Sequence, residues 1–389
     1  MMESVYEKLK KAQSNQAIID IYQKNSDIVY TGRVKFVTTE DFIMQTYNDF
    51  GVDDGAVFLK NANVALVDFD SYDVEEMMKK ISFARLNNLY GYNFHPNQRF
   101  DETDESLYNQ LFDYLRDNFL LSMIITKKGE KYTYTEGMLM ENNENQMVLQ
   151  AVNKFDFVKQ SLMPIDLDDL VGIEFGGNEL SRLGKVIKTL SFKNHVDPVV
   201  FTDQADIKRQ ILAAQDTENI LIFNFKDERK YFYVGQVLAA NEVEFVIKVI
   251  SMNGTFGGYV WMRYDVVSKV TNNSDYLRVI KEFVELNNTE DLFEIDMLNA
   301  QRDFDSQDNL LLHIIQQAIN EHELFKFKTL DNQEIVGYPG RLDESTWELV
   351  IELFDYDELN ETPARVVGIE SICEISFEYL RLAYLEKNL

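Results

Sequence analysis

Four glycines stand at nearly equal distances along this 389-residue chain, each between two strand-like stretches. They are Gly32, Gly137, Gly235 and Gly340, and the steps from each to the next are 105, 98 and 105 residues. Near-constant spacing on this scale is typical of an internal structural repeat. Alternate glycines are 203 residues apart in both cases, which indicates that a unit of two modules was itself duplicated.

The same order of expected elements surrounds each glycine. A hairpin of alternating apolar residues contains the glycine, as at 17–34, and a polar turn then leads to a third strand, as at 42–47. A period of two indicates strands with one buried face. Two shorter strands and a closing helix follow, and another helix precedes each module. The expected N-caps of the closing helices are Ser71, Asn178, Ser274 and Ser376. The predicted modules are residues 1–90, 105–193, 203–288 and 306–389.

A helix followed by a curled five-stranded antiparallel sheet resembles the Sm-like and SH3-like small β-barrels, in which a glycine lies where the long second strand bends. The resemblance rests on the order of elements and covers nearly the whole chain. It implies an α+β, mainly β fold of four tandem five-stranded barrels, each flanked by helices. RNA-binding Sm proteins also carry an Asp and an Asn flanking an aromatic residue, and an Arg-Gly pair. Here Asp41 and Asn48 flank Phe42, without the Arg-Gly pair.

The net charge of the chain limits the kinds of partner that it is expected to bind. There are 38 Lys and Arg against 66 Asp and Glu, a formal net charge of −28. Phosphate neutralisation by basic side chains supplies most non-specific affinity for nucleic acid, so this balance argues against nucleic-acid partners. It favours protein partners with basic patches. Binding of RNA or single-stranded nucleic acid, by aromatic stacking in a local basic groove, stays open as an alternative.

Residues that carry enzyme or metal chemistry are sparse or out of pattern. Cys373 is the single cysteine, and the four histidines lack metal-ligand spacing. The acidic run at 166–169 lacks the ligand set of an EF-hand. We therefore expect no metal, no cofactor and no catalytic residue. A hydrolase that uses a carboxylate pair in a cleft between modules stays open, and it would show buried acids with perturbed pKa values.

Two connecting segments are candidates for partner binding. The first holds Tyr90, Tyr92, Phe94 and His95, and aromatic residues commonly anchor interfaces. The alternative is that these rings pack between modules, since exposed aromatic patches are unfavourable. The second is the acidic segment 287–309, where Leu292 and Phe293 either belong to a short docking helix or lie in a plain connector.

The remaining expectations concern location and function. No apolar run approaches the roughly 20 residues that span a bilayer, and the first residues lack the order of a signal peptide. We expect a cytoplasmic protein without membrane contact, as a monomer or a low-order oligomer. The sequence favours a non-enzymatic interaction or regulatory protein that binds partner segments by strand addition or helix docking.

Overall fold

The computed structural model divides the chain into two compact units, unit 1 (Met1–His195) and unit 2 (Val196–Leu389). It describes residues 3–89, 100–159, 161–187, 190, 195–215, 217–227, 231–306, 309–343, 345–354 and 364–387. Each hydrophobic cluster formed by the described residues draws its members from one unit alone. Each unit therefore has its own core and is described by itself.

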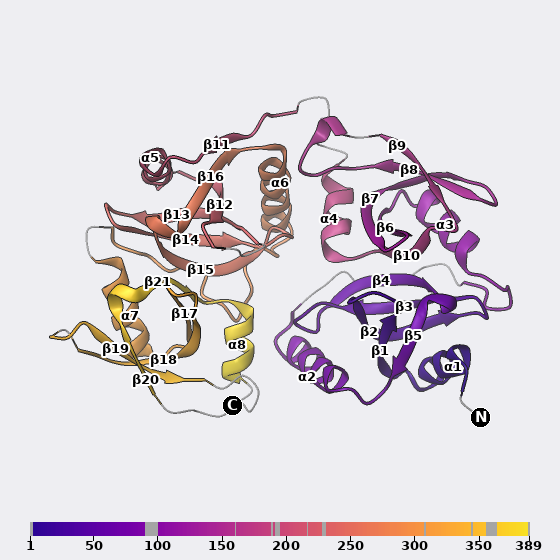
Figure 1. Cartoon of the computed structure of the whole chain (residues 1–389), viewed down its shortest axis with the longest axis horizontal. Coiled ribbons are helices and arrows are strands. Elements are labelled where there is room, and N and C mark those ends of the chain that lie inside the picture. The colour runs from indigo at the N-terminus through magenta and orange to yellow at the C-terminus, as the bar shows by residue number, and fades with distance from the viewer. Residues whose placement is uncertain are drawn as a thin grey trace. The chain divides into compact units, whose positions relative to one another are not determined.

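Unit 1 is built on one ten-stranded antiparallel sheet, in the order β5-β1-β2-β3-β4-β10-β6-β7-β8-β9 (Figure 1). Four α-helices of the described residues accompany it. Its strands are β1 (Ile18–Gln23), β2 (Val29–Val37), β3 (Asp41–Tyr47), β4 (Asp53–Lys60), β5 (Val64–Asp68), β6 (Leu121–Lys128), β7 (Lys131–Asn142), β8 (Gln146–Ala151), β9 (Leu162–Asp166) and β10 (Leu170–Phe175). Its helices are α1 (Val5–Asn15), α2 (Tyr72–Leu86), α3 (Tyr108–Asp117) and α4 (Asn178–Val186).

Unit 2 has an eleven-stranded antiparallel sheet, in the order β11-β16-β12-β13-β14-β15-β21-β17-β18-β19-β20 (Figure 1). Its strands are β11 (Val199–Phe201), β12 (Ile220–Phe225), β13 (Tyr233–Ala240), β14 (Glu244–Ile250), β15 (Phe256–Arg263), β16 (Val267–Asn273), β17 (Phe325–Thr329), β18 (Glu334–Asp343), β19 (Glu348–Leu353), β20 (Arg365–Gly368) and β21 (Ile372–Phe377). Its helices are α5 (Gln204–Ala214), α6 (Asp275–Thr289), α7 (Leu310–Glu321) and α8 (Leu380–Lys387).

The prediction of four closed, Sm-like barrels is wrong, although the α+β, mainly β class is correct. Five consecutive strands do lie together in the order β5-β1-β2-β3-β4, but they do not close on themselves. β4 pairs with β10 instead, and β15 pairs with β21 in unit 2. The physical reason is that an isolated five-stranded segment leaves two edges of unpaired backbone groups, and joining segments edge to edge satisfies one edge of each.

A glycine in each second strand allows the third strand to approach closely. A Cβ atom on Gly32, Gly137 or Gly235 would lie within 3.0 Å of a backbone oxygen of the neighbouring strand. In the last segment Gly337 holds this place, opposite Leu353. Gly340 instead lies at the register shift between Pro339 and Arg341 in the same strand. The close approach therefore belongs to Gly337 in β18.

Side-chain caps begin several helices. Ser71 and Ser274 accept hydrogen bonds from the Val74 and Leu277 amides, which confirms these two predicted N-caps. Asn178 is instead the first residue of α4, after Gly177 at the N-cap. The predicted cap Ser376 lies within β21, four residues before α8 begins.

A buried carboxylate ties the first five-stranded segment of each unit to the helix that precedes the next segment. Asp41, at the start of β3, accepts hydrogen bonds from the Leu107 amide at 2.8 Å and the Ser106 hydroxyl at 2.6 Å, beside the start of α3. Glu244, at the start of β14, accepts one from the Leu310 amide of α7 at 2.7 Å. Backbone amides at a helix start lack intrahelical partners, so these acids act as caps supplied from the sheet.

Candidate functional site

A pocket of about 260 Å³ opens in unit 1 on the face of the sheet where β4 pairs with β10. Its floor follows the register of three adjacent strands, because Met123 of β6 lies opposite both Glu174 of β10 and Glu136 of β7. Residues paired directly opposite one another point to the same face of a sheet. Two further acids, Asp54 and Glu179, complete the lining carboxylates.

Glu174 is held by a tyrosine from the other half of the sheet. The Tyr30 hydroxyl, on β2, donates a hydrogen bond of 2.5 Å to Glu174 Oε1. Burial raises the pKa of Glu174 above its ordinary value of 4.5, against the opposing effect of the Tyr30 hydrogen bond. Burial and the neighbouring Glu174 also raise the pKa of Tyr30. Tyr30 thus remains a proton donor, and Glu174 is a strong acceptor in a partly desolvated place.

Lys154 joins the other two glutamates of the pocket. Its Nζ lies 2.7 Å from Glu136 Oε1 and 2.5 Å from Glu179 Oε1. Burial lowers the pKa of Lys154, but attraction by Glu179 and Glu136 outweighs it and the net shift is upward. Burial raises the pKa of Glu179, and Lys154 opposes that shift. One ammonium group therefore serves two carboxylates, which leaves the group of three negative overall.

Asp54 has a structural role at the pocket's rim. Its Oδ1 accepts a hydrogen bond of 2.8 Å from the Asn178 amide, at the first residue of α4. The N-cap of this helix is Gly177, which has no side chain to cap with, so Asp54 supplies the missing acceptor. The pocket as a whole presents four carboxylates and, through Lys154, one nearby ammonium group.

These contacts decide what the pocket can do chemically. Buried acids with raised pKa values are the feature that the hydrolase alternative requires. A carboxylate pair for hydrolysis, however, needs one acid that can protonate a leaving group and another that can attack or activate water. Glu174 is engaged by Tyr30, and Glu136 and Glu179 share Lys154. Each of these three glutamates therefore already has a hydrogen-bond or ion-pair partner within unit 1.

Of the sequence-based candidates, the structure describes Leu292 and Phe293. Tyr90, Tyr92, Phe94 and His95 fall outside the described residues. Leu292 and Phe293 are both half-buried, in a turn region after α6 where the docking helix was one alternative. The Phe293 carbonyl accepts a hydrogen bond of 2.8 Å from the Phe256 amide, and its ring packs against the unit 2 core. This part of the connector therefore covers a core.

Sequence reasoning missed the pocket, although one signal was available. Tyr30 and Tyr233 each stand two residues before a spaced glycine. The Tyr233 hydroxyl donates a hydrogen bond of 2.9 Å to Glu374, so a tyrosine at this place contacts an acid of the joined segment in both units. The spacing pointed to the tyrosines, but the acids lie more than 140 residues away in the sequence.

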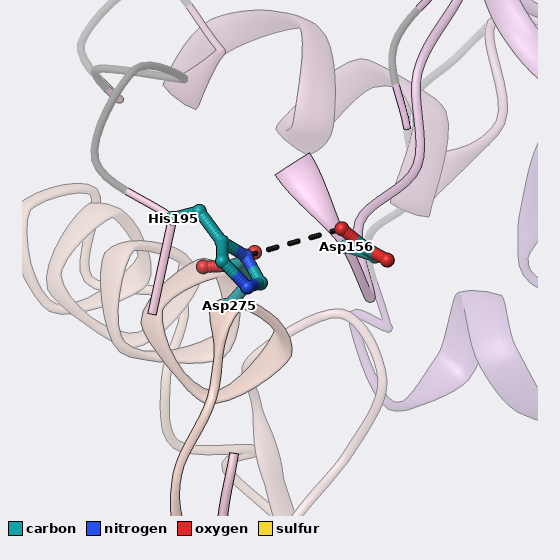
Figure 2. Close-up of side chains that lie close together, drawn as sticks. All are labelled: Asp156, His195 and Asp275. Carbon is teal, nitrogen blue, oxygen red and sulfur yellow. Dashed lines mark ion pairs between the residues drawn. The ribbon is translucent and has the colours of Figure 1, made fainter. Parts of the chain in front are cut away.

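His195, at the end of unit 1, also lies near a carboxylate. Its Nδ1 is 3.9 Å from Asp156 Oδ1 (Figure 2), an ion pair only when the imidazole is protonated. Asp275, also labelled in Figure 2, is the first residue of α6 in unit 2 and accepts a hydrogen bond of 2.9 Å from the Val196 amide. Within unit 1, His195 and Asp156 supply two ligands, whereas zinc sites in proteins use three or four. We assign this pair no metal.

The longest described helices, α2 and α6, have 15 residues each. Within the residues that the structure covers, no helix is both long and apolar enough to cross a bilayer. A scan against models of known protein families finds no match, and neither does a search of the curated proteins.

Proposed function

We propose that this protein is a non-enzymatic interaction protein that binds a basic segment of a partner protein at the carboxylate pocket of unit 1. The observation that carries the proposal is the pocket's charge, four lining carboxylates, two of which share the Lys154 ammonium group. A lysine or arginine side chain in this pocket would gain charge-assisted hydrogen bonds, which are about twice as strong as neutral ones.

The whole chain supports the same kind of partner. A formal net charge of −28 attracts basic surfaces and repels polyanions. Complementary charge of this kind acts mainly on the rate of encounter and on the choice of partner, and it weakens with ionic strength. Binding that slows steeply as salt is added supports this part of the proposal.

Fluorescence anisotropy with a labelled peptide of alternating lysine and glycine, and with its glutamate counterpart, tests the proposal. We expect the lysine peptide to bind and Glu174→Gln to weaken it roughly tenfold, about 1.4 kcal/mol, the size of one hydrogen bond to a charged group. A glutamine still accepts the Tyr30 hydrogen bond, so the fold should be kept. Asp343→Asn is the matched control, since Asp343 is an acid in unit 2 that is far from this pocket in the sequence and not among its lining residues.

Two results would count against the proposal. One is equal loss of affinity in Glu174→Gln and Asp343→Asn, which would mean that only the overall charge attracts the peptide. The other is equal binding of the glutamate peptide. Either result would remove the pocket as the binding site.

A further inference from the structure

One edge of the unit 2 sheet carries an added strand. β11, the three residues Val199, Val200 and Phe201, pairs antiparallel with β16 on the side opposite to β12. Val199 and Val200 are both 43% exposed. The edge of β16 thus pairs with a short extended segment through main-chain hydrogen bonds, and only its third residue, Phe201, packs against the unit 2 core.

The matching edge of unit 1 is β5. β5 pairs with β1 as β16 pairs with β12, with Val67 opposite Ile21 and Val270 opposite Phe223. Both strand pairs have a register shift, near the start of β5 in unit 1 and near the start of β16 in unit 2. Among the described residues, however, β5 is the last strand of its sheet. An edge that is covered in unit 2 is therefore open in the described part of unit 1.

The composition of β5 suits it to accept a strand. It has five residues without proline, and Leu66 is 45% exposed. The Lys8 ammonium group donates a hydrogen bond of 3.4 Å to the Val67 carbonyl of this strand. The other end of the sheet, β9, contains Pro164, which has no backbone N–H to offer an incoming strand. Of the two edges of unit 1, β5 is the better template.

We propose that β5 accepts an extended segment of a partner protein as an additional antiparallel strand, in the way that β16 accepts β11. The segment has β-branched or aromatic residues at its centre, where one would pair opposite Leu66, and basic residues toward the end that passes Asp68 and Asp70. Main-chain hydrogen bonds supply affinity in this mode, and alternate side chains supply specificity. The basic character of the segment rests on the proposed function; the strand pairing does not.

The test uses the isotopically labelled full chain and a capped peptide that carries Val-Val-Phe, the sequence of β11, between lysines. We expect amide chemical-shift changes and slowed hydrogen exchange at residues 64–68. Leu66→Lys should weaken binding at least tenfold, because a charge on an edge strand opposes pairing. Val366→Lys is the matched control, since Val366 is 58% exposed on the edge strand β20. Circular dichroism checks that both variants keep the fold.

The outcomes separate this inference from the proposed function. Shifts near Tyr30 and Glu174 without shifts at residues 64–68 would overturn strand addition and support the pocket. Equal binding of a peptide whose lysines are replaced by threonine would keep strand addition and count against the basic partner. No change at residues 64–68, or binding that survives N-methylation of the peptide backbone, would overturn the inference. A concentration-dependent dimer that Leu66→Lys abolishes would do so as well, since the edge would then serve a second copy.

Discussion

Gly337 and Gly340 lie three residues apart in β18, yet their surroundings differ. A Cβ on Gly337 would meet the Glu352 backbone oxygen within 3.0 Å, and backbone cannot move aside easily. A Cβ on Gly340 would first meet the Glu352 side chain, at 3.2 Å, which is flexible. Glycine is therefore required in β18 at Gly337, where two strands approach closely.

At the residue scale, we predict that Gly337→Ala destabilises the protein by about 2–3 kcal/mol, the usual cost of forcing an extra carbon into packed structure. Gly340→Ala should change the free energy of unfolding by less than about 1 kcal/mol. Urea denaturation of both variants measures the difference. A larger loss for Gly340→Ala than for Gly337→Ala would contradict the assignment of the close approach.

At the element scale, helix α3 begins against a carboxylate that belongs to the sheet. Asp41 is 2% exposed and also accepts a hydrogen bond from the Thr38 hydroxyl at 2.8 Å. Burial raises the pKa of Asp41, although its hydrogen bonds to Ser106, Leu107 and Thr38 oppose that shift. Asp41 thus links β3 and the turn before it to helix α3, which lies far along the sequence.

We predict that Asp41→Ala costs about 2–4 kcal/mol, because the buried Leu107 amide and two hydroxyls lose their acceptor. Asp41→Asn keeps an acceptor oxygen and should cost less than half as much. Native-state hydrogen exchange of the α3 amides measures the loss of stability at the first turn of this helix, where Asp41 binds. Equal costs for the two variants would show that charge, and not the acceptor, matters at Asp41.

At the scale of the whole molecule, several buried acids share one direction of pKa shift. Burial raises the pKa values of Asp41, Glu174 and Glu179 in unit 1 and of Glu323 and Glu386 in unit 2. At a pH between the ordinary and the raised pKa, the folded chain therefore binds more protons than the unfolded chain. Stability that is present below the ordinary pKa is therefore lost as the pH rises through the raised pKa. The net charge of −28 acts in the same direction through self-repulsion.

We predict that the free energy of unfolding is greater near pH 5 than near pH 8. Added salt should reduce this difference in free energy, because it screens the self-repulsion of the chain. Glu174→Gln should flatten the dependence above pH 4.5, the ordinary value for a glutamate, since it removes one of the buried charges. Thermal or urea unfolding across this range measures both effects. A stability that rises steadily from pH 5 to pH 8 would contradict the prediction.

Much of the local structure could be predicted from residue patterns. The alternation at 17–34 predicts the β1–β2 hairpin, which pairs as expected, and Ser71 caps α2 as its place before the helix indicates. Such features depend on neighbours within a few residues. The pocket could not be predicted, because Tyr30 and Glu174 are 144 residues apart and meet only where β4 pairs with β10.

The sequence by itself determined the α+β class, the hairpins and two of the four predicted helix caps, because backbone preference and hydrophobic period act locally. Only the tertiary structure decided whether five-stranded segments close into barrels. That choice depends on which strand satisfies the open edge of β4, and β10 does so from more than 100 residues away. The same long-range pairing assembles the carboxylate pocket. Hydrophobic alternation is the same for a strand paired with either partner, so it carries no information on this choice.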